Sequence, residues 1–124
     1  MIKTRVLLKR DAPVLLLEDE YLVLLDLKVA LEDMGFTDIS CSASVSDALK
    51  RCAMRLPEFA LLDVNLGSEK SFPVAHALYD KGVPFVFVTA YGRAGLEGQY
   101  DDIEVLTKPV DAFDIGSVIA MAQG

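Results

Sequence analysis

Short apolar runs alternate with helical stretches along most of the chain. The runs that predict strands lie at residues 14–18, 38–43, 58–63, 84–89 and 103–108. The first, third and fourth of them are apolar almost throughout, which is typical of strands buried on both faces of a parallel sheet. Because strand and helix alternate five times, we expect an α/β domain built on a parallel sheet.

A helix is expected over residues 20–34, before Gly35 stops it. One face of this helix carries apolar side chains at helical spacing and should pack on the sheet. The outer side carries a second apolar stripe, which consists of Leu22, Leu25 and Val29. Single exposed leucines are ordinary on protein surfaces, so a solvated surface and a partner-docking surface both remain open for this stripe.

Capping residues place the later helices. The second helix is expected to begin at Ser44 or Ser46, the third at Ser71, and the fifth to span about residues 111–122. Residues 91–102 contain three glycines and little amphipathic pattern, so a fourth helix there should be short or irregular. This segment is the best candidate for a part that changes conformation.

The length of 124 residues is that of one ordinary domain, and we expect residues 1–124 to form a single unit with residues 1–11 as an N-terminal extension. No apolar stretch approaches the roughly 20 residues that span a bilayer. Lys9 and Arg10 stand where a cleavable signal would need small residues. The sequence therefore predicts a cytoplasmic protein that does not enter a membrane.

Acidic residues outnumber basic ones, and the formal net charge is −7. A basic face is the expected footprint of a protein that binds nucleic acid. We therefore expect no direct contact with nucleic acid, and a protein or a small phosphorylated compound as partner. Cys41 and Cys52 lie eleven residues apart without a CxxC spacing, which favours two reduced thiols over a metal site or a disulfide.

Polar side chains follow four of the predicted strands. In an open parallel sheet the ligand site lies beyond the carboxyl ends of the strands, and here those ends carry Glu18, Asp19 and Glu20, then Asp63, Thr89 and Lys108. Neighbouring carboxylates repel one another and lose solvation, so they require compensating positive charge. Lys108 supplies one such charge. Because the ligands are oxygens alone, without His or Cys, Mg²⁺ is the expected source of the rest.

Such a site suits a phosphoryl group. Mg²⁺, a lysine and a threonine hydroxyl can each hold one phosphoryl oxygen while a carboxylate attacks the phosphorus. Asp63 stands alone at its strand end and is the candidate nucleophile. A strand-end Asp by itself is more often a helix cap or a turn residue, but the coincidence of four polar strand ends favours a functional role.

The strings LLLEDE, LLDVNL, FVTA and LTKP occur in this order over nearly the whole chain. In this combination the sequence resembles the receiver domain of two-component response regulators. The resemblance implies a flavodoxin-like fold, which is a doubly wound, five-stranded parallel sheet of order 2-1-3-4-5 with five helices. It also implies a cis bond between Lys108 and Pro109.

The resemblance further implies roles for individual residues. Asp63 would be the phosphoacceptor, with Thr89 and Lys108 binding phosphoryl oxygens. Glu18, Asp19, Asp63 and the main-chain carbonyl of Asn65 would hold Mg²⁺. The implied protein is a phosphoacceptor signalling protein rather than an enzyme. It would receive its phosphoryl group from a sensor histidine kinase or a phosphotransfer protein, and it would signal to a downstream protein by direct contact.

Two parts of the sequence depart from the usual pattern of the family. Receivers usually carry an aromatic residue three before the lysine, and here that position is Val105. Residues 84–92, PFVFVTAYG, are similar to the FAT-GUY variant of receivers, with Val88 and Ala90 in place of the usual Ala and Gly. In such a variant, Tyr91 and the glycine-rich segment after it would replace the missing aromatic as the moving part.

Other functions share parts of this pattern. A pseudo-receiver would keep the fold as a phosphorylation-independent protein-binding module, and Val105 is mildly in its favour. Phosphatases of the haloacid dehalogenase type need a second acid two residues after the nucleophile, where this chain has Asn65. A flavodoxin-like electron carrier needs a phosphate loop after the first strand, where the acidic string EDEYL would repel a phosphate. We therefore expect a stand-alone receiver that is phosphorylated on Asp63.

Overall fold

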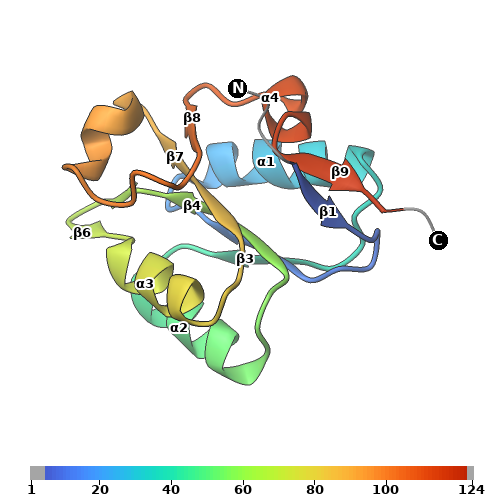
Figure 1. Ribbon diagram of the computed structural model, residues 1–124, viewed down its shortest axis with the longest axis horizontal. Helices are drawn as coiled ribbons and strands as arrows, with labels where there is room; N and C mark the ends of the chain where they lie inside the picture. The colour runs from blue at the N-terminus through green and yellow to red at the C-terminus, as the bar shows by residue number, and fades with distance from the viewer. Residues whose placement is uncertain (1–4, 123–124) are drawn as a thin grey trace.

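Five parallel strands form the central sheet of the computed structural model, which describes residues 5–122 (Figure 1). These strands are β2 (Val14–Leu17), β3 (Ile39–Ser42), β4 (Phe59–Asp63), β7 (Phe85–Thr89) and β8 (Val105–Thr107). Their order is β3-β2-β4-β7-β8, and every neighbouring pair is parallel. The predicted sheet and its 2-1-3-4-5 order are confirmed, with each strand slightly shorter than its apolar run.

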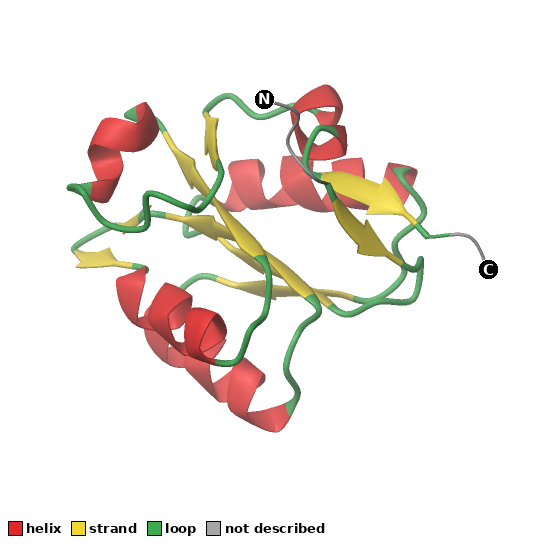
Figure 2. Ribbon diagram, viewed as in Figure 1, coloured by secondary structure: helices red, strands yellow, loops and turns green. Residues whose placement is uncertain are grey.

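Helices cover both faces of this sheet (Figure 2). Two α-helices, α1 (Tyr21–Asp33) and α4 (Ala112–Gly116), pack on one face through residues such as Leu31 and Ile115. The other face is covered by α2 (Val45–Met54) and α3 (Phe72–Asp80). Because both faces are covered, the strands are buried on both sides, as their uninterrupted apolar sequences predict.

Two helices begin where the sequence predicts, although only Ser44 caps its helix through its side chain. The side chain of Ser44 accepts a hydrogen bond from the backbone N–H of Asp47 and caps α2. Ser71 is the N-cap residue of α3, and a proline follows in the first turn. The predicted irregular fourth helix is η1 (Gly92–Leu96), a single stretch of 3₁₀-helix. Among residues 5–122 there are thus four α-helices and this short 3₁₀-helix.

The last predicted helix is wrong beyond Gly116. After α4 the described residues instead form β9 (Ile119–Met121), which pairs in parallel with β1 (Val6–Leu8). Residues 118 and 119 are β-branched, a property that favours strands over helices, and the partner strand comes from the expected N-terminal extension 1–11. Residues 1–4 of that extension lie outside the described residues. Strands β1 and β9 thus form a two-stranded sheet that is separate from the central one.

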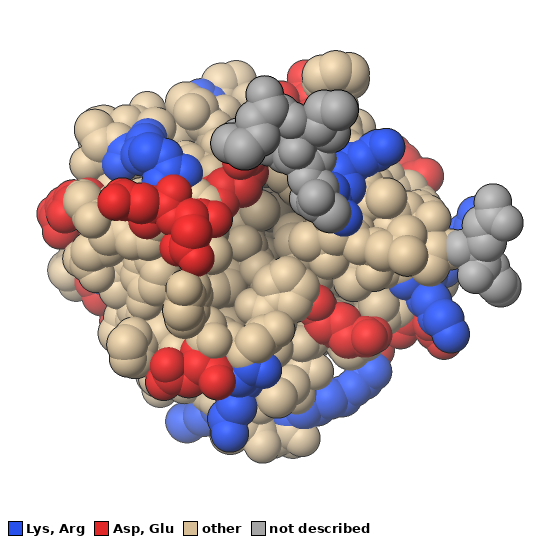
Figure 3. All heavy atoms as spheres, viewed as in Figure 1, with Lys and Arg blue, Asp and Glu red and all other residues tan. Residues whose placement is uncertain are grey.

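Two further properties of the fold are its surface charge and the length of its helices. On the face that Figure 3 shows, basic side chains lie in separate groups between acidic ones. Of the helices within residues 5–122, none combines the length and the apolar character needed to cross a bilayer.

Candidate functional site

The register of the sheet aligns the four polar strand ends at one edge. Leu17 pairs with Leu62, so the next residues of these two strands, Glu18 and Asp63, stand level with each other. On the other side of β4, Asp63 pairs with Val88 at the end of β7. Thr89 follows Val88 in turn, and its carbonyl accepts a hydrogen bond from the N–H of Lys108 at 2.9 Å. The residues predicted from the strand ends therefore share one edge of the sheet.

Three carboxylates gather at this edge. Glu18, Asp19 and Asp63 each offer one oxygen, and these oxygens lie within 4.8 Å of one another. Glu18 is 1% exposed and Asp63 is 4% exposed, whereas Asp19 is open to solvent. A hard divalent cation prefers carboxylate oxygens, so the donor set of this cluster fits Mg²⁺ with its solvent-facing side at Asp19.

Lys108 is the cation of the cluster. Its Nζ lies 2.8 Å from Glu18 Oε1, donates a hydrogen bond to Asp63 Oδ2 at 3.3 Å, and lies 3.8 Å from Glu20 Oε1. Burial works against the charged amine, but the neighbouring carboxylates of Glu18 and Asp63 outweigh it and raise the pKa of Lys108. Lys108 therefore stays charged at neutral pH. The bond between Lys108 and Pro109 is cis, as the family resemblance implies.

One lysine does not balance the buried acids. Burial, followed by the neighbouring Asp63 carboxyl, raises the pKa of Glu18 from 4.5 to about 7, although Lys108 acts in the opposite direction. Without a further positive charge, Glu18 therefore keeps its proton to a higher pH than an ordinary glutamate. A divalent cation at this cluster would supply that charge and favour the ionised form.

The second oxygen of Asp63 faces a hairpin that directly follows the strand. The hairpin consists of β5 (Asn65–Leu66) and β6 (Glu69–Lys70), which pair antiparallel. The N–H of Asn65 donates to Asp63 Oδ1 at 3.4 Å, and Lys70 Nζ donates to Asn65 Oδ1 at 2.5 Å. Gly67 turns the hairpin with a φ of 63°, a conformation that suits glycine. No local sequence pattern marks Lys70, because its partnership with Asn65 depends on the register of the hairpin.

Thr89 is fully buried at the end of β7. Its Oγ1 accepts a hydrogen bond from the N–H of Tyr91 at 3.0 Å. The same oxygen lies against Gly95 of η1, where an added Cβ would come within 2.8 Å of it. The sequence suggests that this glycine makes the segment irregular, but the structure shows that it also leaves room for the hydroxyl of Thr89.

An aromatic ring packs against the same core cluster as Val105, the position where the family's usual aromatic residue is missing. Val105 is half-buried against the same core cluster as Tyr100. The ring of Tyr100 has its centroid 5.5 Å from that of Phe87 and also contacts the rings of Phe72, Tyr79 and Phe85. Tyr100 thus brings an aromatic side chain to this region from the segment that follows η1.

The structure brings together most of the predicted site residues. Lys108 contacts Glu18 and Asp63 directly, Asp19 completes the carboxylate cluster, and Asn65 contacts Asp63 through its backbone N–H. Thr89 lies at the neighbouring strand end, with its hydroxyl turned to the backbone of Tyr91.

Known structures resemble this chain over most of its length, although no protein-family model matches it. The solution structure of SdrG from Sphingomonas melonis Fr1 is 34% identical, covers 90% of this chain and 95% of that one, and has a TM-score of 0.76. The response regulator REC domain of PhyR from Erythrobacter litoralis is 25% identical, covers 87% of this chain and 86% of that one, and has a TM-score of 0.77.

A curated relative extends the comparison. The acid tolerance regulatory protein ActR of Sinorhizobium medicae is 25% identical over 119 residues. The match covers 92% of this chain but only 61% of ActR, so the chain spans less than two thirds of the length of this relative.

Proposed function

The chain belongs to the response regulator receiver domains, and from this premise we propose that it takes a phosphoryl group onto Asp63 in a Mg²⁺-dependent reaction and signals by protein contact. The observation that carries the proposal is the environment of Asp63. Its buried carboxylate has Lys108 on one oxygen and the N–H of Asn65 on the other, with two further acids beside it. This arrangement holds a nucleophile next to the charges that a phosphoryl group needs.

In the proposed reaction a carboxylate oxygen of Asp63 attacks the phosphorus of a phosphohistidine. The new O–P bond forms as the P–N bond breaks, and the electron pair of that bond returns to the imidazole, which takes a proton from solvent. Lys108 shifts from the carboxylates toward a phosphoryl oxygen, and the hydroxyl of Thr89 leaves the N–H of Tyr91 to bind another. Glu18, Asp19, Asp63 and the carbonyl of Asn65 would hold Mg²⁺, which would supply positive charge for the phosphoryl oxygens.

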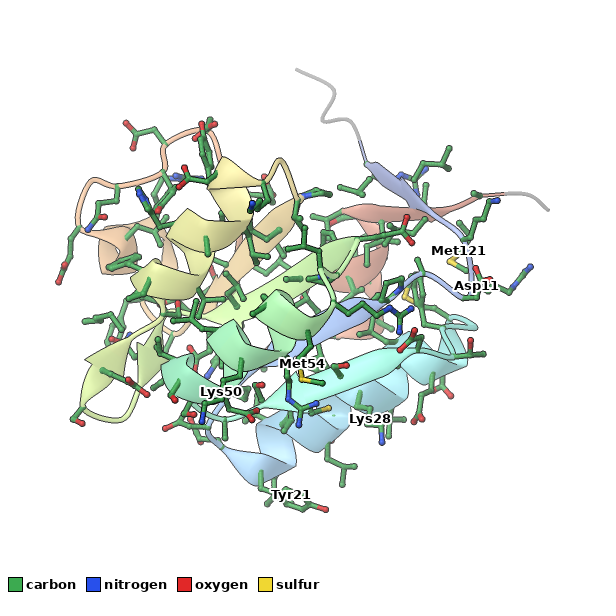
Figure 4. All side chains as sticks on the ribbon, turned by 90° about the horizontal axis from the view of Figure 1, so that it is seen from below. Asp11, Tyr21, Lys28, Lys50, Met54 and Met121 are labelled. Carbon is green, nitrogen blue, oxygen red and sulfur yellow. The ribbon has the colours of Figure 1, made fainter. Side chains whose placement is uncertain are left out.

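The expected phosphodonor is a protein that carries its phosphohistidine to this edge. Tyr21 and Leu22 follow Glu20 directly and are 72% and 73% exposed, and Tyr21 projects from the first turn of α1 (Figure 4). The outer stripe predicted on this helix, Leu22, Leu25 and Val29, is solvent-exposed and begins two residues after Glu20. A groove of about 310 Å³ between α1 and the loop after β8 is lined in part by Glu20 and Lys108. We propose that the donor docks on this stripe, because a protein seated there reaches Asp63.

The test is phosphorylation of the purified chain by acetyl phosphate with Mg²⁺, read by intact mass. The wild type should gain the mass of one phosphoryl group, whereas Asp63→Asn should gain none. Asp111→Asn is the matched control, because Asp111 caps α4 and lies outside the carboxylate cluster. A phosphohistidine-bearing kinase or phosphotransfer domain serves as a second donor, since some acceptors react slowly with small molecules.

A pseudo-receiver remains the second candidate, favoured by Val105 at the position of the usual aromatic residue. It predicts that the wild type stays unmodified with both donors and that partner binding is the same for the wild type and Asp63→Asn. Phosphorylation of Asp63 that alters partner binding would exclude this candidate.

A further inference from the structure

Lys70 and Asn65 form a cross-strand pair on the hairpin after Asp63. They occupy directly opposite positions of β5 and β6, which brings their side chains within reach of each other. Lys70 Nζ donates to the amide oxygen of Asn65 at 2.5 Å. A hydrogen bond from a charged donor is stronger than one between neutral groups, so the amide oxygen of Asn65 is held toward Lys70.

The hairpin is anchored beside the site. Leu66 is 5% exposed and packs in the core beneath the hairpin. Glu69 Oε2 accepts a hydrogen bond from the N–H of Val45 at the start of α2, at 3.2 Å. Figure 1 shows β6 at the same end of the sheet as η1, beyond the carboxyl ends of the strands. The pair is therefore held in place near Asp63 rather than carried on a free loop.

The two oxygens of Asp63 have different neighbours. Oδ2 accepts from Lys108, and Oδ1 accepts from the N–H of Asn65. The hairpin thus lies on the side of the carboxylate that Lys108 leaves free. A group on this side is well placed to influence a water molecule that approaches a phosphoryl group on Asp63.

The hydrogen-bonding groups of the Asn65 side-chain amide determine how it can act on a nearby water. An amide has one oxygen that accepts and one NH₂ group that donates. The oxygen can accept a hydrogen bond from a water and so orient the lone pair of that water toward phosphorus, as a glutamine side chain does in GTP hydrolysis. The N–H groups instead bind a water through its lone pair, which is the pair needed for attack. The bond from Lys70 directs Oδ1 toward the ammonium, so the oxygen is not free to turn to a water near Asp63.

From this geometry we propose that Lys70 is a positioning residue that prolongs the life of the acyl phosphate by keeping Asn65 Oδ1 from the attacking water. The inference rests on the proposed phosphorylation of Asp63. In the step that it slows, water oxygen bonds to phosphorus as the O–P bond to Asp63 breaks. The electron pair stays on the carboxylate, and the proton of the water passes to phosphate or solvent.

The experiment follows the decay of the phosphorylated full chain after acetyl phosphate is removed, with Mg²⁺ present, by intact mass and phosphate release. Loss of a charged hydrogen bond of this kind should speed decay of Lys70→Met about three- to tenfold. Lys70→Arg keeps a charged donor and should decay close to the wild-type rate. Lys50→Met removes an equal charge from α2 (Figure 4) and should not change the rate.

A double variant separates this role from a general effect of charge. In an Asn65→Ala background the oxygen that Lys70 holds is gone, so Lys70→Met should cause no further acceleration. An equal acceleration in both backgrounds would overturn the proposal, as would wild-type or slower decay of Lys70→Met. If the wild type is never phosphorylated on Asp63, the proposed function and this inference both fall. If phosphorylation occurs and only the Lys70 effect is absent, the proposed function stands.

Discussion

Lys108 Nζ lies 2.8 Å from Glu18 Oε1, and the two side chains join the last strand of the sheet to the end of β2. Glu18 is 1% exposed and the Lys108 side chain is 18% exposed, so the pair is largely shielded from water. A buried charge that loses its partner is costly. The same lysine also contacts Asp63, so two buried carboxylates depend on a single amine.

Stability without Mg²⁺ should fall as pH rises from about 5 to 7. The pKa of Glu18 is raised from 4.5 to about 7 in the folded chain, so in this range the folded state binds more protons than the unfolded state. The contribution of Glu18 to the free energy of unfolding, up to about 3 kcal/mol, is therefore present at low pH and lost as pH rises through about 7. Urea unfolding with EDTA at pH 5 and pH 7.5 measures this difference in the free energy of unfolding.

Two comparisons isolate Glu18 in that experiment. Glu18→Gln should lose this part of the pH dependence, whereas the exposed control Glu58→Gln should keep it. Added Mg²⁺ should stabilise the wild type more at pH 7.5 than at pH 5, because the cation favours ionised carboxylates. Wild-type and Glu18→Gln curves with the same slope against pH would contradict the assignment.

Asp19→Ala should weaken Mg²⁺ binding by about tenfold or more, since it removes the solvent-facing carboxylate of the cluster. Because Asp19 is exposed, its loss should leave the free energy of unfolding nearly unchanged. Isothermal titration calorimetry gives the affinity. The matched control is Asp33→Ala, an exposed acid at the far end of α1. Equal affinity in Asp19→Ala and the wild type would remove Asp19 from the site.

Gly95→Ala should destabilise the fold by about 1–3 kcal/mol, because the added Cβ would lie 2.8 Å from Thr89 Oγ1. It should also slow phosphorylation, since the displaced hydroxyl is the one proposed to bind the phosphoryl group. Gly116→Ala is the control, because a Cβ there meets nothing within 4 Å. Urea titrations of both variants provide the check, and equal stabilities would show that Thr89 adjusts freely.

Binding of a phosphoryl mimic such as beryllofluoride should change the amide NMR signals of residues 89–102. Thr89 Oγ1 is bonded to the N–H of Tyr91, and this bond must break if the hydroxyl turns to the phosphoryl group. The change should reach Tyr100, which Arg93 links to η1 through its hydrogen bond to the Tyr100 carbonyl. Lys108→Ala should suppress this response. Unchanged signals over residues 89–102 in the wild type would reject the segment as the moving part.

Local sequence patterns predict many of the strands and helices of this fold. Uninterrupted apolar runs identify β2, β4 and β7, and capping residues such as Ser44 and Ser71 place helix starts correctly. The polar residues at the strand ends come together because parallel strands deliver their carboxyl ends to one edge. For that reason the cluster of Glu18, Asp63 and Lys108 could be predicted from the positions of these residues at the ends of predicted strands.

What the tertiary structure decided lies in contacts between distant or irregular segments. The sequence by itself determined the α/β alternation and the convergence of Asp63 and Lys108, since both follow from periodicity and strand polarity. Only the folded chain pairs β1 with β9, turning an expected helix into a strand, because that choice depends on a partner more than a hundred residues away. Likewise, the bond of Lys70 to Asn65 and the approach of Gly95 to Thr89 arise from hairpin register and close packing, which no local pattern encodes.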